Sequence, residues 1–305
     1  MDKTKRPGAP HGTGRAEGND FASISPTAKV VAYFRAYTDI PYAKWIAQEA
    51  NAAQVSMEML GGWDKLDKMA GFLVPFLELR YKGINAQLGR LGSNSILEIA
   101  SGISPRAIEL SRNPYLNYVA TDLPEMMGEQ VSLFSRILSG STRSNLFMLG
   151  ANALNLQELE AAAAILRARA VPITVINEGL LVYLTKEEKA RVASNIHSVL
   201  GGSGAWVTPD IYTSQELEAM IRRDPEMSDA LDAVWGKVHR DMRDNMFDTR
   251  EEAVSLFEGL GFRVERRKSM DGSFVMSSLL RLGPSEDRLE ALGKHETWVM
   301  RPRQQ

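Results

Sequence analysis

Two acidic residues, Glu98 and Asp122, stand in or directly after short apolar segments of the sequence. Glu98 lies in SILEIA at 95–100, a run with the length and apolar character of a strand covered on both faces in a parallel sheet. A lone buried carboxylate costs several kcal/mol, so a carboxylate in this position must be paired or hydrogen-bonded. Glu98 therefore requires either a local partner or a ligand.

Polar residues recur where the next three predicted strands end. They are Asp122, Asn152, Glu178 and Gly179, which end or follow strands expected at 117–121, 145–149 and 173–178. Because ligands bind beyond the carboxyl ends of the strands in an open parallel sheet, we expect these residues to meet at one site. Asp122 comes 24 residues after Glu98, close to the spacing at which an acidic residue reaches the ribose hydroxyls of an adenosine cofactor.

Two classes of adenosine cofactor compete for such a site. A dinucleotide needs a GxGxxG turn to approach its pyrophosphate, whereas Gly102 is the only glycine between Glu98 and Leu110. S-adenosylmethionine has no phosphate, so one glycine can suffice, and its sulfonium and ammonium groups favour nearby carboxylates. The alternative is that Glu98 caps the following turn and that Asp122 caps the segment opening with Pro124.

These residues must be positioned by an alternating pattern of strands and helices. Residues 1–22 are expected to be a disordered tail, 23–92 an N-terminal helical cap, and 93–305 the domain that carries the site. Seven strands are expected, starting near 95, 117, 145, 173, 205, 262 and 273. Helix-length segments separate most of them, which predicts an α/β fold with a doubly wound, Rossmann-like sheet. A helical insert at about 212–247 is expected to lie over the ligand crevice as a lid.

Composition argues against several other kinds of site. The chain has no cysteine, and its four histidines show no HxxxH or HxH spacing, so neither a disulfide nor a metal site is expected. With 36 basic and 38 acidic residues, nothing favours a nucleic-acid or membrane partner. No apolar run is long enough to span a membrane. We expect a cytoplasmic protein, and whether it is a monomer or a homodimer stays open.

Four segments resemble a known family. They are ISPTAKVVAYFRAYTDIPYAKWIA, ILEIASGISPRAIEL, YVATDLPEMM and NEGLLVYLTKEEKARV. Together they look like the class I methyltransferases of the leucine carboxyl methyltransferase and polyketide O-methyltransferase group. The similarity covers about residues 25 to 211, and EGLLVYL is its most specific part.

The resemblance implies roles for individual residues. It places Glu178 beside the sulfonium of S-adenosyl-L-methionine and lets Gly179 approach the cofactor closely. It also implies that Arg80, in the helix before the first strand, pairs with the cofactor carboxylate. Asn152 stands where many relatives have aspartate at the adenine, and its carbonyl could still accept from the adenine amino group. The predicted cofactor-binding residues are Arg80, Glu98, Ala100, Gly102, Asp122, Leu123, Asn152, Ala153, Glu178 and Gly179.

The sequence thus predicts an S-adenosylmethionine-dependent O-methyltransferase acting on a hydroxyl or carboxylate of a small molecule, such as a secondary metabolite. A hydroxyl usually needs a general base, whereas a carboxylate does not. His239 is the candidate base, and Tyr183 could orient the acceptor. An aromatic lid is expected from Tyr33, Tyr37, Tyr42, Trp45, Tyr212 and Trp235. The alternatives are a cofactor-binding protein without catalysis and a nicotinamide-dependent doubly wound enzyme.

Overall fold

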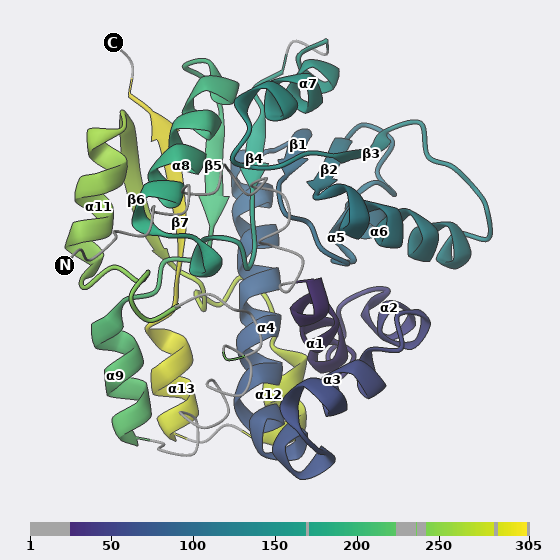
Figure 1. The fold of residues 1–305 in the computed structure, drawn as a ribbon, viewed down its shortest axis with the longest axis vertical. Helices are drawn as coiled ribbons and strands as arrows, with labels where there is room; N and C mark the ends of the chain where they lie inside the picture. The colour runs from purple at the N-terminus through teal and green to yellow at the C-terminus, as the bar shows by residue number, and fades with distance from the viewer. Residues whose placement is uncertain (1–24, 169–170, 224–235, 237–241, 284–285, 304–305) are drawn as a thin grey trace, which may run out of the picture.

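The structure is a computed structural model that describes residues 25–168, 171–223, 236, 242–283 and 286–303. The N-terminal part is helical, as expected, and its helices are α1 (Ser25–Arg35), α2 (Ala43–Glu49), α3 (Ala52–Leu60) and α4 (Trp63–Leu91). Helices α1, α2 and α3 lie together beside the lower ends of the strands in Figure 1, and α4 runs upward from them along the sheet. This arrangement places the helical cap beside the edge of the sheet where a ligand would bind.

The described residues form a seven-stranded sheet in the order β3-β2-β1-β4-β5-β7-β6. The strands are β1 (Ser95–Glu98), β2 (Asn117–Asp122), β3 (Leu146–Gly150), β4 (Thr174–Ile176), β5 (Ala205–Thr208), β6 (Phe262–Lys268) and β7 (Glu296–Pro302). Strands β1 to β5 pair in parallel, whereas β7 is antiparallel to both β5 and β6. The register sets Glu98 opposite Ala120 and Ile176, and Asp122 opposite Gly150, so the predicted polar strand ends share one edge.

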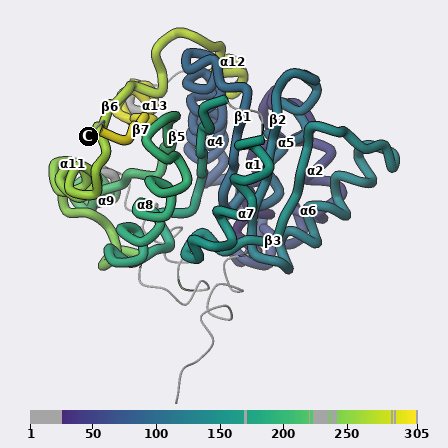
Figure 2. Tube along the Cα trace, turned by 90° about the horizontal axis from the view of Figure 1, so that it is seen from above, coloured from purple at the N-terminus to yellow at the C-terminus, as the bar shows by residue number. Residues whose placement is uncertain are grey.

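Helices cover both faces of the sheet, because alternate strand residues point into two separate cores. Ile96 and Tyr118 belong to the core under α4, α5 (Arg106–Leu110) and α6 (Pro124–Ile137). Leu97 and Val119 belong to the core on the other face, with α7 (Leu156–Arg167), α8 (Lys186–Leu200) and α11 (Arg250–Gly259). Figure 2 views this layered arrangement from above. The predicted doubly wound α/β fold is confirmed.

The prediction of the seventh strand near residue 273 is wrong. The apolar run SFVMSSLLRL contains helix α12 (Ser277–Leu282), and the seventh strand is the C-terminal β7. The carboxylate of Glu78, on α4, accepts from the backbone N–H groups of Ser277 and Ser278 at 2.8 Å each. Two free N–H groups at the start of α12 are thus satisfied by a residue almost 200 positions away, a contact that no local sequence pattern reveals.

The insert expected at about 212–247 is described at its two ends. It begins with α9 (Ser214–Arg223), and Thr213 and Phe247 form an isolated parallel bridge, so the ends of the insert meet. Trp235 and His239 lie outside the described residues. The C-terminal region adds α13 (Glu286–Gly293) before β7. No helix among the described residues is both long and apolar enough to cross a membrane.

Candidate functional site

The structure brings the ten predicted cofactor-binding residues together. All ten, with Tyr183, line one cavity at the carboxyl ends of β1 to β4. Its volume is about 190 Å³, roughly ten times the space that a single water molecule needs, so the cavity can admit a small organic molecule. His239, the candidate base, lies outside the described residues.

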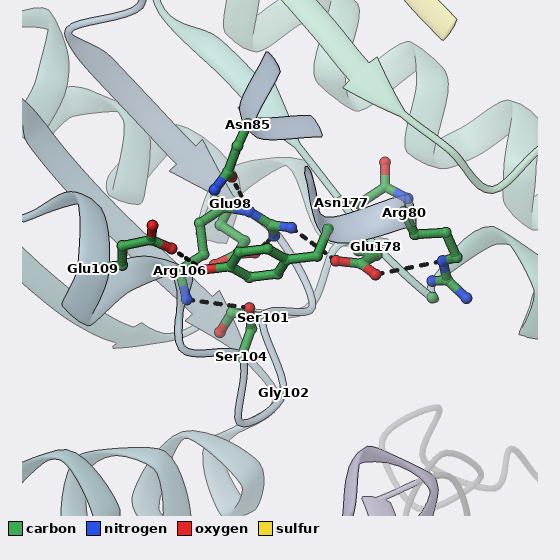
Figure 3. Close-up of polar contacts among 12 residues, drawn as sticks. Arg80, Asn85, Glu98, Ser101, Gly102, Ser104, Arg106, Glu109, Asn177 and Glu178 are labelled. Atoms are coloured by element: carbon green, nitrogen blue, oxygen red, sulfur yellow. Dashed lines mark hydrogen bonds and ion pairs between the residues drawn. The ribbon is translucent and has the colours of Figure 1, made fainter. Parts of the chain in front are cut away.

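Glu98 has the local partner that its burial requires. The Arg106 guanidinium lies 2.6 Å from its Oε1 (Figure 3). The Tyr118 hydroxyl donates to its Oε2 at 2.7 Å. All three side chains are almost completely buried. Neither oxygen accepts from the following turn in the described structure, so the capping alternative does not account for Glu98. The Glu98 side chain nevertheless lines the cavity, although Arg106 neutralises its charge.

The turn after β1 has one glycine where the family pattern has two, and Ala100 adopts a strained backbone conformation there. Ala100 has φ +51° and Gly102 has φ +54°, so both adopt the left-handed conformation. That conformation costs a residue with a Cβ about 1–2 kcal/mol, whereas glycine adopts it freely. A Cβ on Gly102 would lie 3.5 Å from the Cβ of Ala28 on α1. The turn therefore lies directly against the helical cap.

Asp122 is placed by two backbone donors. Its Oδ2 accepts from Gly102 N–H at 2.7 Å and its Oδ1 from Leu123 N–H at 2.8 Å. Helix α6 has no side-chain cap, so the alternative in which Asp122 caps the segment opening with Pro124 is not observed. Burial raises the pKa of Asp122 to about 6, against the lowering effect of these two hydrogen bonds. Each oxygen keeps a free lone pair at the cavity, which two ribose hydroxyls could use.

Glu178 lies among three arginines. Its Oε1 contacts Arg35, which is on α1, and its Oε2 lies 2.8 Å from Arg106. Arg80 Nε lies 3.4 Å from Oε1, an ion contact without hydrogen-bond geometry (Figure 3). Although burial acts to raise the pKa of Glu178, the three guanidiniums lower it to about 2. Glu178 is therefore ionised, and its charge holds the cap, α4 and α5 together.

Asp210 anchors the turn that carries Glu178 and Gly179. Its carboxylate accepts from the N–H groups of Gly179 and Leu180 at 2.8 Å each and from the Asn177 side chain at 2.7 Å. It also lies 3.3 Å from Nη2 of Arg80. Gly179 has φ +80°, and a Cβ there would lie 3.2 Å from Arg80, so this glycine makes room for a guanidinium. The close approach that the resemblance implies for Gly179 is to the cofactor and stays a prediction.

The far end of the cavity lies after β3. The Asn152 side-chain carbonyl accepts from Leu154 N–H at 2.9 Å, and the backbone carbonyl of Ala153 accepts from the side-chain amide of Asn195 at 3.0 Å. Both Asn152 and Ala153 line the cavity next to the apolar side chain of Leu154. This end has the amide groups and apolar walls that could bind a flat heterocycle.

The roof of the cavity is built from residues of α1 and α2 that are non-aromatic and mostly small or aliphatic. The residues that line it are Thr27, Ala28, Val31, Ala32, Arg35, Ala43 and Ile46. The expected aromatic lining is not seen for Tyr33, Tyr37, Tyr42 or Trp45, none of which lines the cavity, and Trp45 is about half exposed. Tyr212 also lies elsewhere, against Phe76 and His295. The helical cap does cover the strand ends, but without an aromatic surface.

Tyr183 is the expected catalytic residue that the structure describes. Its hydroxyl lies 3.1 Å from the hydroxyl of Thr27, so it links the EGLLVYL segment to α1. Burial raises the pKa of Tyr183, which keeps the phenol neutral. A neutral phenol can orient an acceptor by hydrogen bonding, but it is a weak base.

Sequence reasoning missed three charged residues of this site, namely Arg35, Arg106 and Asp210. Arg106 and Asp210 had usable signals, because Arg106 lies eight residues after the carboxylate that needs a partner and Asp210 follows the end of β5. Arg35 had no such signal beyond its position in the first of the four segments that resemble the family. These residues supply most of the charge around the two glutamates.

Comparison with known proteins supports the fold. A scan of the sequence against protein-family models finds no match, and a search of curated proteins finds none either. Among solved structures, a candidate methyltransferase from Thermobifida fusca YX matches with a TM-score of 0.53 and 13% identity over 90% of this chain and 95% of that one. Human N-acetylserotonin methyltransferase, solved with S-adenosylmethionine, matches with a TM-score of 0.47 and 11% identity over 92% of this chain and 72% of its own.

PigF, solved with S-adenosylhomocysteine, matches with a TM-score of 0.44 and 11% identity over 70% of this chain. The match spans about half the length of PigF, 51%. At such identities the likeness establishes the fold alone. The chain has the seven-stranded sheet, with β7 antiparallel, that is typical of the Rossmann-like fold of class I methyltransferases.

Proposed function

We propose that the protein is an S-adenosylmethionine-dependent O-methyltransferase that acts on a hydroxyl or carboxylate of a small molecule. The observation that carries the proposal is the charge of the cavity. Three carboxylates and two guanidiniums line it, which leaves one net negative charge; they are Glu98, Asp122, Glu178, Arg35 and Arg80. Arg106 and Asp210, which lie behind this lining and pair with it, cancel each other. S-adenosylmethionine carries a sulfonium, an ammonium and a carboxylate, hence one net positive charge, so cofactor and site complement each other.

The residues at each strand end match successive parts of this cofactor. Asn152 and Ala153 would contact the adenine, Asp122 the ribose hydroxyls, and the Glu98 and Glu178 end the methionyl part. When bound, the cofactor supplies an electrophilic methyl group. The chain's own residues then need only orient the acceptor and exclude water, because methyl transfer is an in-line displacement. Helix α1 covers the site in the way that exclusion of water requires.

A nicotinamide cofactor fits less well. Its pyrophosphate requires backbone N–H groups at the start of a helix, and α5 is five residues long and begins after Pro105, which has no N–H. The net negative charge of the site would also repel a pyrophosphate. These two features favour S-adenosylmethionine over the dinucleotide alternative.

The acceptor chemistry rests on the groups that face the cavity. Tyr183 lines the cavity and is neutral. The described histidines His197 and His295 do not line the cavity. A carboxylate acceptor would need no base, whereas a hydroxyl acceptor would need one from outside the described residues, such as His239. Both acceptor types therefore stay within the proposal.

Isothermal titration calorimetry of the purified protein tests cofactor choice. We expect S-adenosylmethionine and S-adenosylhomocysteine to bind and NAD to show no heat of binding at the same concentrations. Saturable binding of NAD without binding of S-adenosylhomocysteine would overturn the proposal.

A second experiment separates an enzyme from a cofactor-binding protein without catalysis. The protein is incubated with methyl-labelled S-adenosylmethionine and a small-molecule extract, and a labelled organic product is expected. A protein that binds the cofactor but labels nothing across varied extracts would favour the non-catalytic alternative.

A further inference from the structure

Lys189, on α8, is a buried cation without an ion-pair partner among the described residues. The residue is 3% exposed, and no carboxylate of the described part of the chain lies within 4.0 Å of its Nζ. Lysine is almost never buried to this extent unless it is paired, because an isolated charge is costly to remove from water. The surroundings of Lys189 must therefore offset this cost in another way.

Two backbone carbonyls and one aromatic ring surround the amine of Lys189. Its Nζ donates to the carbonyl oxygens of Leu184 and Asn245. It also lies 5.5 Å from the centroid of the Phe247 ring, within the range of a cation–π contact. A neutral amine has two N–H groups and an ammonium has three, so the two carbonyls satisfy all donors of the neutral form and only part of those of the charged form.

The two carbonyls belong to different parts of the molecule. Leu184 ends the EGLLVYL segment and lines the cavity. Val192, on the turn of α8 that follows Lys189, lines the cavity as well. Asn245 belongs to the C-terminal end of the insert. The amine of Lys189 therefore joins the insert to a wall of the cavity.

The end of the insert that contacts Lys189 also closes the insert on itself. Ser214, at the start of α9, donates its backbone N–H to the carbonyl of Phe247 at 2.8 Å. Thr213 forms the isolated parallel bridge with the same residue. We expect movement of residues 245–247 away from Lys189 to break the Ser214 hydrogen bond as well. Exchange of the Ser214 N–H with solvent then reports that movement.

The charges around Lys189 do not compensate for its burial. Burial lowers the pKa of Lys189 to about 8. The charged groups that act on it are Glu188, Asp210 and Glu187, which raise the pKa, and Lys186, which lowers it. Three of these four belong to α8 itself, and Asp210 follows β5.

The insert end and α11 add three further acidic groups near this contact, namely Asp244, Asp248 and Glu252. None of the three forms an ion pair with Lys189. Glu252 instead accepts from the Nζ of Lys186 at 2.7 Å and from the backbone N–H of Asp248 at 2.6 Å. The contact of Lys189 with the insert thus rests on the carbonyl of Asn245 and the ring of Phe247.

Opening of the insert end should take up a proton. Without Asn245 and Phe247 the amine meets water, where the pKa of a lysine is about 10.5. The closed form, with its lower pKa, binds the proton less tightly, so the closed form gains stability as the pH rises from about 8 to about 10.5. Below pH 8 both forms are protonated, and opening no longer depends on pH.

We propose that Lys189 is a positioning residue that holds the end of the insert against the cavity wall, and that the insert end opens with uptake of a proton by this residue. The inference goes beyond the proposed function, because it does not depend on which cofactor or acceptor the cavity binds. At neutral pH the amine is charged, so the contact is at its weakest and the insert end opens most readily.

Hydrogen exchange of the full-length protein, followed by mass spectrometry, tests the inference. Protection factors, corrected for the intrinsic pH dependence of exchange, are measured at pH 7, 8 and 9 for peptides that cover Ser214 and residues 242–248. Peptides from α6 serve as the internal reference, since this helix lies on the side of the molecule away from α9 (Figure 1).

Three variants complete the design. Lys189→Arg keeps a positive charge and donors for the carbonyls, but the guanidinium does not titrate in this pH range. Lys189→Met removes both the charge and the donors. Lys294→Met is the matched control, because it removes an exposed lysine whose ion-pair partner is Glu290.

In wild type we expect protection of the two peptides to rise about tenfold from pH 7 to pH 9 relative to α6, the change that pKa values of about 8 in the closed form and about 10.5 in the open form produce. Lys294→Met should show the same rise. Neither Lys189→Arg nor Lys189→Met should show a rise relative to α6.

Protection that stays constant between pH 7 and pH 9 in wild type, or a rise that persists in Lys189→Arg, would overturn the inference. The wild-type measurement decides the matter even where a variant fails to fold. Binding of S-adenosylhomocysteine plays no part in the readout, so a protein that does not bind it would refute the proposed function and leave this test unaffected.

Discussion

The raised pKa of Asp122 makes stability and binding depend on pH in a way that one substitution can isolate. The pKa of about 6, against 3.8 for an ordinary aspartate, means that the folded protein holds this proton more tightly than the unfolded chain does. Stability is therefore lost as the pH rises from about 4 to about 6. A shift of about two units corresponds to about 3 kcal/mol, and partial exposure of the carboxylate reduces this to about 2 kcal/mol.

Asp122→Asn removes this titration while retaining the shape of the side chain. The amide can accept from only one of the two backbone donors, Gly102 and Leu123, and this loss costs the variant about 1–3 kcal/mol at every pH. The free energy of unfolding of the variant, relative to wild type, should therefore increase by about 2 kcal/mol between pH 4 and pH 8. Urea unfolding of both proteins at these two pH values measures the difference.

Cofactor binding should show the opposite pH dependence. Only the ionised carboxylate can accept from both ribose hydroxyls, so wild-type affinity for S-adenosylhomocysteine should be about tenfold lower at pH 5 than at pH 8. Asp122→Asn should bind weakly at both values. A stability difference that stays constant with pH, or a variant that binds as well as wild type at pH 8, would refute the reasoning.

Three further predictions concern the rest of the site and its support. Glu178→Gln should lower the free energy of unfolding by about 3–5 kcal/mol, because it leaves three buried guanidiniums without their shared anion, and a melting temperature equal to that of wild type would contradict this. Ala100→Gly should be neutral or stabilising by up to about 1 kcal/mol, since relief of the left-handed strain exceeds or balances the added chain entropy, whereas a clear loss in urea unfolding would show that Ala100 is unstrained. Thr185→Ala should cost about 1 kcal/mol by removing the capping box of α8, and thermal unfolding that does not change would rule out that contribution.

The residues at the strand ends could be predicted from the sequence, because each strand and the polar residue that follows it are adjacent in the chain. Parallel strands share an edge, so polar residues at the ends of consecutive strands must converge whatever else the chain does. Asp122, Asn152 and Glu178 were found in this way and do line one cavity. The capping boxes of α8 and α9 are equally local, because both partners lie within four residues of each other.

The charge network could not be predicted, because its partners are distant in the chain. Glu178 meets Arg35 across 143 residues, and Asp210 meets Arg80 across 130. The family resemblance implies that Glu178 lies beside the cofactor, and the structure adds a structural role for its charge. The prediction of an aromatic cavity lining from the cap was wrong for a similar reason, because tertiary packing decides which face of α1 meets the site.

The seventh strand shows the limit of apolar patterns. SFVMSSLLRL is compatible with a short strand, but Glu78 satisfies the first N–H groups of α12 and so favours a helix there. The true seventh strand has buried residues on both faces, including Trp298 and Val299. Such continuous burial gives no alternation from which a strand can be recognised.

A crystal structure of the protein with S-adenosylhomocysteine tests the central claim most directly. We predict the adenine beside Asn152 and Ala153, both ribose hydroxyls within hydrogen-bond distance of the Asp122 carboxylate, and the thioether sulfur between the ends of β1 and β4. Density for the ligand outside this cavity, or a ribose that does not contact Asp122, would contradict the assignment of the cavity as the cofactor site.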